Sequence, residues 1–95
     1  MPQPAATSAH PFRLSEATPG AALRVTGLAA AADAAQGQAA RLAELGFLPG
    51  EPARVLRRGP FGGDPLAVRV GASTFALRRA EAAAVLVEPW TEDAP

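Results

Sequence analysis

The chain has 95 residues, of which nine are basic and nine acidic, so its formal net charge is zero and no overall field draws it toward nucleic acid or an anionic membrane. It contains no cysteine, which excludes disulfide bonds and thiolate metal sites. Its length is that of one small domain.

The two ends of the chain have compositions unsuited to a core. Residues 1–12 hold three prolines among small and polar residues, and we expect a flexible tail there, with a second loose tail over residues 90–95. The first residues contain no basic start followed by an apolar run, and no stretch is long and apolar enough to cross a membrane. We therefore expect a cytoplasmic protein without direct membrane insertion, whose ordered domain spans residues 13–89.

The first ordered segments are a strand and a helix. Residues 23–28 read as the first strand, and an alanine-rich helix is expected from Asp33 to about Leu45. Gly46 directly after this pattern suits the left-handed residue that ends a helix. Pro49 and Gly50 then predict a tight turn that reverses the chain.

Three segments with a period of two follow, over residues 53–58, 66–70 and 75–77. Short glycine-rich loops join them, which predicts an antiparallel meander. A helical turn is expected over residues 79–84, and a last short strand over residues 85–87. The fold class is therefore mainly β: a small SH3-like barrel of about five strands, with one helix between the first and second strands and a short helical turn before the last.

The residue types argue against an enzyme. The chain has no Lys, Tyr or Cys, and its single histidine, His10, lies in the expected tail. Proton transfer and nucleophilic attack both need a positioned pair of such groups. No cofactor is expected to be required, and His10 is the weak candidate for a metal ligand, joined by carboxylates such as Glu16 or Glu81 at a subunit contact.

Arginines are frequent in the meander, but they do not predict a nucleic-acid site. RNA recognition also needs exposed aromatic residues for stacking. Phe47 and Phe75 fit the core, which leaves Phe61 and Trp90. We therefore interpret the arginines as the solvent-facing side of a barrel and expect no nucleic-acid partner.

The two turns carry the candidate partner-binding residues. Phe61 at a hairpin tip could either cap the barrel or serve as an exposed anchor, and Leu48 poses the same question. The full candidate set is Leu48, Pro49, Pro60, Phe61, Gly62, Gly63 and Asp64.

Between residues 14 and 88 the sequence resembles the ferrous iron transport protein A (FeoA) family. The resemblance rests on motifs in order: Leu14 with Pro19 and Gly20, an Arg-Leu-x-x-Leu-Gly-hydrophobic-x-Pro-Gly run at 41–50, the hairpin at 60–65, Val70 with Gly71, and Ala-Leu-Arg with Glu-Ala at 76–82. It implies an SH3-like barrel that acts on the cytoplasmic side of the FeoB permease, whose G domain hydrolyses GTP.

The resemblance also implies further properties. Family members are described as binding transition metals, so zinc or ferrous iron is a candidate ligand, and a homodimer is compatible with the small core. Related domains occur at the C-terminus of metal-dependent repressors. The alternative function is therefore a free-standing SH3-like module that binds a transition metal or nucleic acid in regulation.

Overall fold

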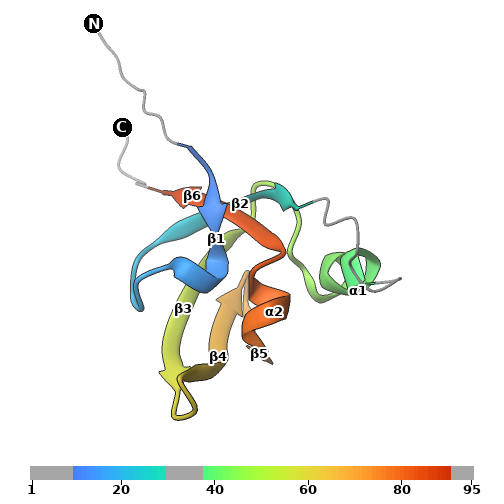
Figure 1. Ribbon diagram of the computed structural model, residues 1–95. Coiled ribbons are helices and arrows are strands. Elements are labelled where there is room, and N and C mark those ends of the chain that lie inside the picture. The colour runs from blue at the N-terminus through green and yellow to red at the C-terminus, as the bar shows by residue number, and fades with distance from the viewer. Residues whose placement is uncertain (1–9, 30–37, 91–95) are drawn as a thin grey trace, which may run out of the picture.

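A computed structural model describes residues 10–29 and 38–90 of the chain. Its elements follow in the order β1 (Phe12–Arg13), the 3-10 turn η2 (Leu14–Glu16), β2 (Leu23–Leu28), α1 (Gln38–Leu45), β3 (Pro52–Gly59), β4 (Gly63–Val70), β5 (Ser73–Leu77), α2 (Arg79–Ala82) and β6 (Val85–Pro89) (Figure 1).

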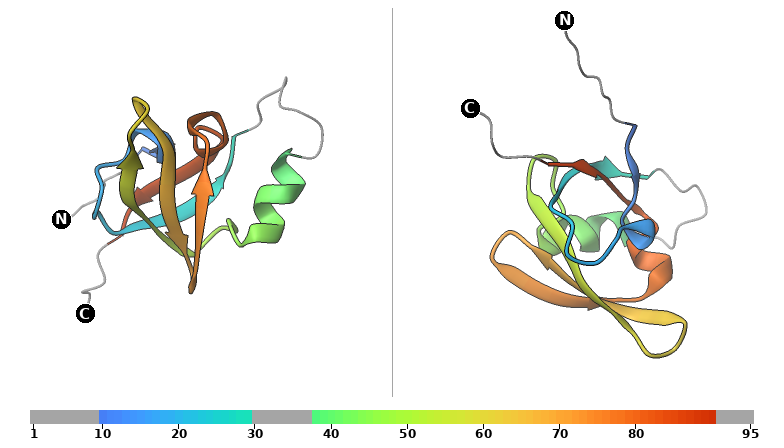
Figure 2. Two further views of the ribbon diagram at one scale, coloured as in Figure 1. Left: turned by 90° about the horizontal axis from the view of Figure 1, so that it is seen from below. Right: turned by 90° about the vertical axis from the view of Figure 1, so that its left-hand side faces the viewer.

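The strands form one antiparallel sheet in the order β1-β6-β2-β3-β4-β5. The consecutive strands β3, β4 and β5 are the predicted meander, and β6 returns to pair with both β1 and β2. The sheet curls around its own core, as Figure 2 shows, with β1 and β5 as its two edges. Curling buries one face of every long strand, which accounts for the alternating sequence.

The core fills the inside of this curled sheet. Val55 on β3 lies opposite Val68 on β4, and both side chains are fully buried. Phe47, which follows α1, is also fully buried, with its ring centroid 6.4 Å from that of Phe75 on β5. Every described residue that is buried is apolar. Apolar burial therefore supplies the main stabilising term.

A bulge in β3 changes which side chains face outward. The β3–β4 register shifts between Val55 and Arg57, so Leu56 is an extra residue without a partner on β4. Such a bulge bends the strand and redirects a side chain. Leu56 keeps the outward direction that alternation after the buried Val55 gives it and is 42% exposed. After the bulge, Arg58 and not Arg57 lies opposite the buried Leu66.

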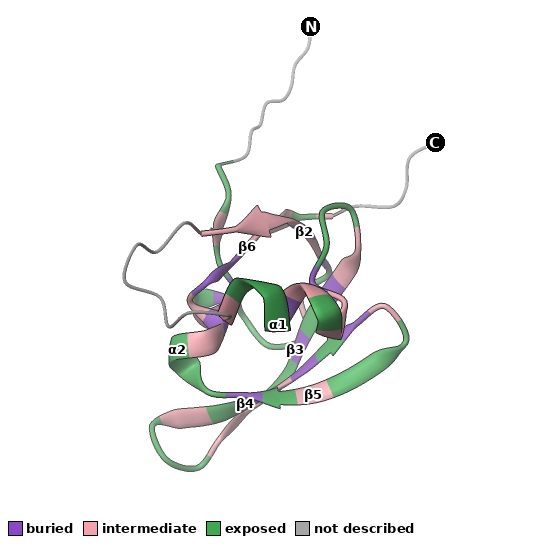
Figure 3. Ribbon diagram, turned by 90° about the vertical axis from the view of Figure 1, so that its right-hand side faces the viewer, coloured by how far each residue is buried: buried purple, intermediate pink, exposed green. Residues whose placement is uncertain are grey.

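Helix α1 lies beside the barrel and is held there by few side chains. Leu42 is its only buried residue, and most of the rest of the helix is exposed, as Figure 3 shows. The neighbouring Arg41 forms an ion pair with Glu81 of α2. This pair joins the two helices through residues that lie 40 positions apart in the sequence.

The predicted mainly β fold class is confirmed, with one additional strand. That strand is β1, whose residue Phe12 pairs with Val87 although the sequence analysis assigned it to the N-terminal tail. Trp90 was assigned to the C-terminal tail, yet it is half-buried. Its backbone N–H donates a hydrogen bond to the carbonyl of Ala22 at 3.1 Å. The predictions for residues 1–9, 33–37 and 91–95 fall outside the described residues.

Candidate interaction surfaces

The β3–β4 hairpin carries the most exposed large apolar side chain among the described residues. Phe61 is 79% exposed at its tip. The N–H and carbonyl of Phe61 are both hydrogen-bonded to Asp64, at 3.2 Å each, which closes a two-residue turn. Gly62 and Gly63 have φ angles of 68° and 94°, and a turn with two left-handed residues suits glycine. Phe61 therefore projects outward and does not cap the barrel.

Asp64 has an internal role. Its Oδ1 accepts a hydrogen bond from the backbone N–H of Arg79 at 2.8 Å, at the first residue of α2. Helix N-termini expose N–H groups that have no partner within the helix, and a carboxylate is a favourable acceptor there. Of the seven candidate binding residues, Asp64 is thus engaged within the protein, whereas Pro60 and Gly62 are exposed and Gly63 is half-buried.

The second candidate turn joins α1 to β3. Leu48 is 47% exposed and Pro49 is exposed, while the preceding Phe47 is buried. The turn is attached to the barrel because the N–H of Gly50 donates to the carbonyl of Val25 on β2, at 2.7 Å. A rigid support therefore holds the side chain of Leu48 in solvent.

The two turns do not form one surface. Leu48 precedes the first residue of β3 and Phe61 follows its last residue, so the eight-residue strand separates them (Figure 1). At about 3.3 Å per residue such a strand is roughly 25 Å long. Both loops were predicted as one set of partner-binding residues, but the fold places them at opposite ends of β3.

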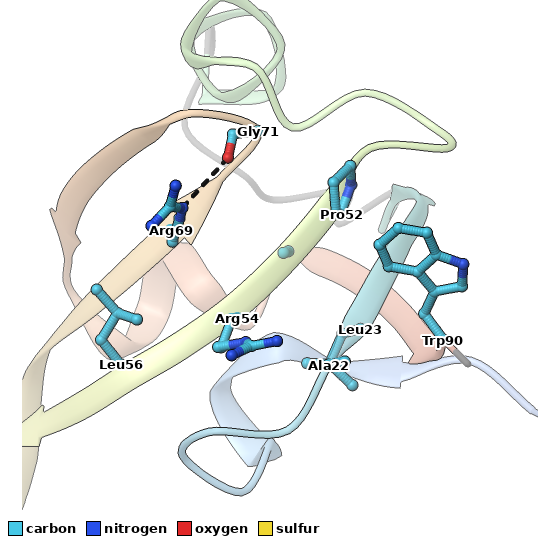
Figure 4. Close-up of a pocket in the computed structure, with 9 residues that line it drawn as sticks. Ala22, Leu23, Pro52, Arg54, Leu56, Arg69, Gly71 and Trp90 are labelled. Carbon is cyan, nitrogen blue, oxygen red and sulfur yellow. Dashed lines mark hydrogen bonds between the residues drawn. The ribbon is translucent and has the colours of Figure 1, made fainter. Parts of the chain in front are cut away.

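A groove on the outer face of β2, β3 and β4 was not predicted. It has a volume of about 320 Å³, and Figure 4 shows Arg54 and Arg69 in its middle, Leu56 at one end and Trp90 at the other. The residues that line it are Ala22, Leu23, Pro52, Ala53, Arg54, Leu56, Arg69, Gly71 and Trp90. The alternation of β3 and β4 indicated that Arg54 and Arg69 face outward, but not that the two strands place them opposite each other.

The pKa of one carboxylate is shifted by its structural contacts. The pKa of Glu81 is lowered, first because its carboxylate accepts a hydrogen bond from the backbone N–H of Arg78 and also because Arg41 lies beside it. This is a structural contact at the start of α2. His10 is exposed just before β1, and residues 10–29 and 38–90 contain no cluster of three or more His, Asp or Glu side chains suited to a metal ion.

Within the same described ranges, no helix has the length and apolar character needed to span a membrane.

Comparison with known proteins gives a consistent result. The sequence model of the FeoA domain matches residues 12–89. A solved FeoA structure from Stenotrophomonas maltophilia, in complex with zinc, is 42% identical with a TM-score of 0.71, over 80% of this chain and 88% of that protein. It is described as a prokaryotic SH3 domain protein and a candidate activating factor of ferrous iron transport. No curated protein matches the chain.

Two further solved structures agree. FeoA from Chlorobium tepidum is 32% identical with a TM-score of 0.72, over 87% of this chain and 74% of that protein. A protein from Pseudomonas aeruginosa is 35% identical with a TM-score of 0.58, over 81% of this chain and 99% of that protein. The predicted SH3-like fold is therefore confirmed.

The zinc in the Stenotrophomonas protein raises the question whether this chain could hold the same ion. Structural zinc sites use four ligands, mostly Cys and His. The described residues include one histidine, exposed and outside any ligand cluster. They therefore do not fit such a site.

Proposed function

This chain belongs to the FeoA domain family, and from that premise we propose that it is a cytoplasmic accessory factor of ferrous iron uptake, which docks on the FeoB permease through the Phe61 hairpin. The observation that carries the proposal is the 79% exposure of Phe61 on a closed, hydrogen-bonded turn.

An exposed aromatic side chain on a rigid support is well suited to anchoring a partner. The turn is closed by two hydrogen bonds and its base is tied to α2 through Asp64, so little conformational entropy remains to be lost on binding. Burying a phenylalanine side chain contributes about 1.5–3 kcal/mol. One such residue can therefore act as a binding hot spot.

In this proposal the chain acts by binding and not by catalysis. The Stenotrophomonas relative is described as a candidate activating factor, which supports an accessory role here. We propose that the contact forms on the cytoplasmic side, where the G domain of the permease lies. A homodimer would present two hairpin tips to the same assembly.

The test compares two aspartate substitutions in binding to the cytoplasmic domain of the permease. Because the two turns lie at opposite ends of β3, a single docking face would include one of them only. We expect Phe61→Asp to weaken binding at least about 30-fold, the loss of one hot-spot residue. Leu48→Asp should have a much smaller effect.

Ala72→Asp is the matched control, since Ala72 is an exposed residue in the turn between β4 and β5. It introduces the same charge at the end of β4 opposite to the hairpin tip, in the turn whose Gly71 N–H donates to the carbonyl of Pro52. Thermal unfolding shows whether each variant is folded. A folded Phe61→Asp protein that binds as tightly as the Ala72→Asp control would overturn the proposal.

A further inference from the structure

Two arginines face each other across β3 and β4. Arg54 and Arg69 are directly opposed in the strand register, and both side chains are exposed. Like charges at such positions destabilise a sheet. Neither forms an ion pair with a carboxylate in residues 10–29 and 38–90, and the side chain of Arg69 has only a 3.4 Å contact to the carbonyl of Gly71.

Other arginines of the barrel are engaged. Arg24 binds Glu88 at 2.9 Å, and Arg41 binds Glu81. Arg58 donates to two backbone carbonyls, those of Ser15 and Ala17. Arg54 and Arg69 differ from these arginines in two ways. Their charges lie next to each other, and neither guanidinium group donates to a carboxylate of the described residues.

The charges lie between apolar walls. Leu56 faces outward on the same side of β3 as Arg54 and forms one end of the groove, while Trp90 and Pro52 form the other (Figure 4). Trp90 is held in place by its backbone hydrogen bond to Ala22. Apolar side chains on both sides of the two cations would gain by contact with apolar groups of a ligand, because burying them removes apolar surface from water.

We propose that this groove binds an acidic segment of a partner protein, whose carboxylates accept hydrogen bonds from Arg54 and Arg69 and whose flanking apolar side chains contact Leu56 and Trp90. Guanidinium groups bind carboxylates in a planar, two-bond arrangement, which gives orientation as well as attraction. The groove is lined by neither Phe61 nor Leu48, so this is a site separate from the proposed docking hairpin.

The chemistry of the groove favours a peptide over a nucleic acid. Binding to a phosphate backbone is driven mainly by neutralising many charges, and the chain as a whole has a net charge of zero. A peptide with alternating acidic and apolar side chains matches two cations flanked by apolar residues more closely than a nucleic-acid backbone does. The volume of about 320 Å³ is enough for a few side chains but not for a large ligand.

The experiment uses the full chain and a peptide of alternating glutamate and leucine as the probe. Trp90 is the only tryptophan, so its fluorescence reports occupation of this groove directly. We expect the probe to change the Trp90 emission in a saturable way. The Arg54→Ala/Arg69→Ala double variant should bind at least about tenfold more weakly, as expected for lost hydrogen bonds to charged groups.

An Arg57→Ala/Arg79→Ala double variant is the matched control. It removes the same charge from exposed positions that do not line the groove, and it should bind the probe within about twofold of the parent. Equal weakening in the two double variants, or no saturable change in Trp90 emission, would show that the attraction is non-specific and overturn the proposal.

Two further measurements distinguish a partner peptide from other occupants of the groove, namely RNA and the chain's own C-terminal segment. Tighter binding of a single-stranded RNA than of the peptide would replace the proposal by a nucleic-acid site. Glu92→Gln/Asp93→Asn removes the two carboxylates that follow Trp90 in the sequence. If this change raised the affinity for the probe several-fold, the occupant would be the chain's own C-terminal segment and not a partner.

Discussion

The carboxylate of Asp64 joins two segments that are distant in the sequence, because its Oδ1 accepts a hydrogen bond from the backbone N–H of Arg79 at 2.8 Å. Asp64 is the second residue of β4, directly after the hairpin turn, and Arg79 is the first residue of α2. The contact thus orients the hairpin that carries Phe61 relative to the short helix.

Asp64→Ala should lower the free energy of unfolding. The substitution leaves an N–H at the start of α2 without its acceptor, which at helix N-termini costs about 0.5–2 kcal/mol. Urea denaturation measures the loss. Asp64→Asn retains an acceptor oxygen, so its free energy of unfolding should fall less than that of Asp64→Ala. If Asp64→Ala were as stable as the parent, a water molecule would be replacing the carboxylate fully.

Gly59→Ala should destabilise the base of the hairpin. An added Cβ would lie 2.5 Å from the carbonyl oxygens of Asp64 and Pro65, and both are backbone atoms that cannot rotate away. Overpacking of this kind costs about 1–3 kcal/mol. Gly27→Ala is the control, because a Cβ there would meet nothing within 4 Å. Equal unfolding midpoints for the two variants would contradict the expected clash.

Arg58→Ala should loosen the segment around η2. The Nη2 atom of Arg58 donates to the carbonyls of Ser15 at 3.0 Å and Ala17 at 2.6 Å, which ties this segment to β3. Hydrogen bonds that involve a charged group contribute about 1.5–3 kcal/mol. Hydrogen exchange should accelerate in residues 14–17. Arg57→Ala is the control, because Arg57 is the exposed neighbour of Arg58. It should leave the hydrogen exchange of residues 14–17 unchanged.

Arg54→Thr should raise stability, in contrast to most substitutions. It removes one of two like charges that face each other across β3 and β4 and introduces a residue with high strand propensity. The gain expected from relieving such a pair is about 0.2–1 kcal/mol. The midpoint of chemical denaturation measures it at low ionic strength, and the gain should shrink in high salt. A loss of stability would mean that Arg54 supports the sheet through packing.

Glu81 should make the stability depend on pH in the acid range. Its pKa is lowered below the ordinary 4.5, so the folded state favours the ionised carboxylate. The stabilisation is fully present above 4.5 and is lost as the pH falls through the lowered value. Glu81→Gln should flatten the dependence of unfolding free energy on pH below 4.5. Glu44→Gln, which removes an exposed carboxylate of α1 in the same way, is the comparison variant.

Most of the strands could be predicted from the sequence, because the period of two is a local property. Val55, Leu66, Val68 and Leu77 alternate with exposed residues, and all four are buried as expected. Strand β1 was missed because two residues are too few to show a period. Phe12 joins the sheet only because β6 returns to pair with it.

The candidate site was predictable in part. Phe61 and Leu48 are identified by apolar side chains in glycine-rich turns, and both are exposed. Their separation by the length of β3 is a property of the folded strand. The groove was not predicted. Alternation places Leu56 on the same face of β3 as Arg54, but Trp90 follows the last strand, far from β3 in the sequence, and only the pairing of β6 with β2 and of β2 with β3 brings it to this face.

The sequence by itself determined the mainly β class, the turn positions and the presence of an aromatic residue at the hairpin tip, because alternation and glycine conformations are decided within a few neighbouring residues. The structure decided that this aromatic residue, Phe61, is exposed and does not cap the barrel. Only the tertiary structure decided which side chains share a surface. The strand register brings Arg54 on β3 opposite Arg69 on β4, and the pairing of β6 with β2 and of β2 with β3 places Trp90 nearby. That proximity comes from hydrogen bonds and packing between strands distant in the chain, which no local pattern specifies.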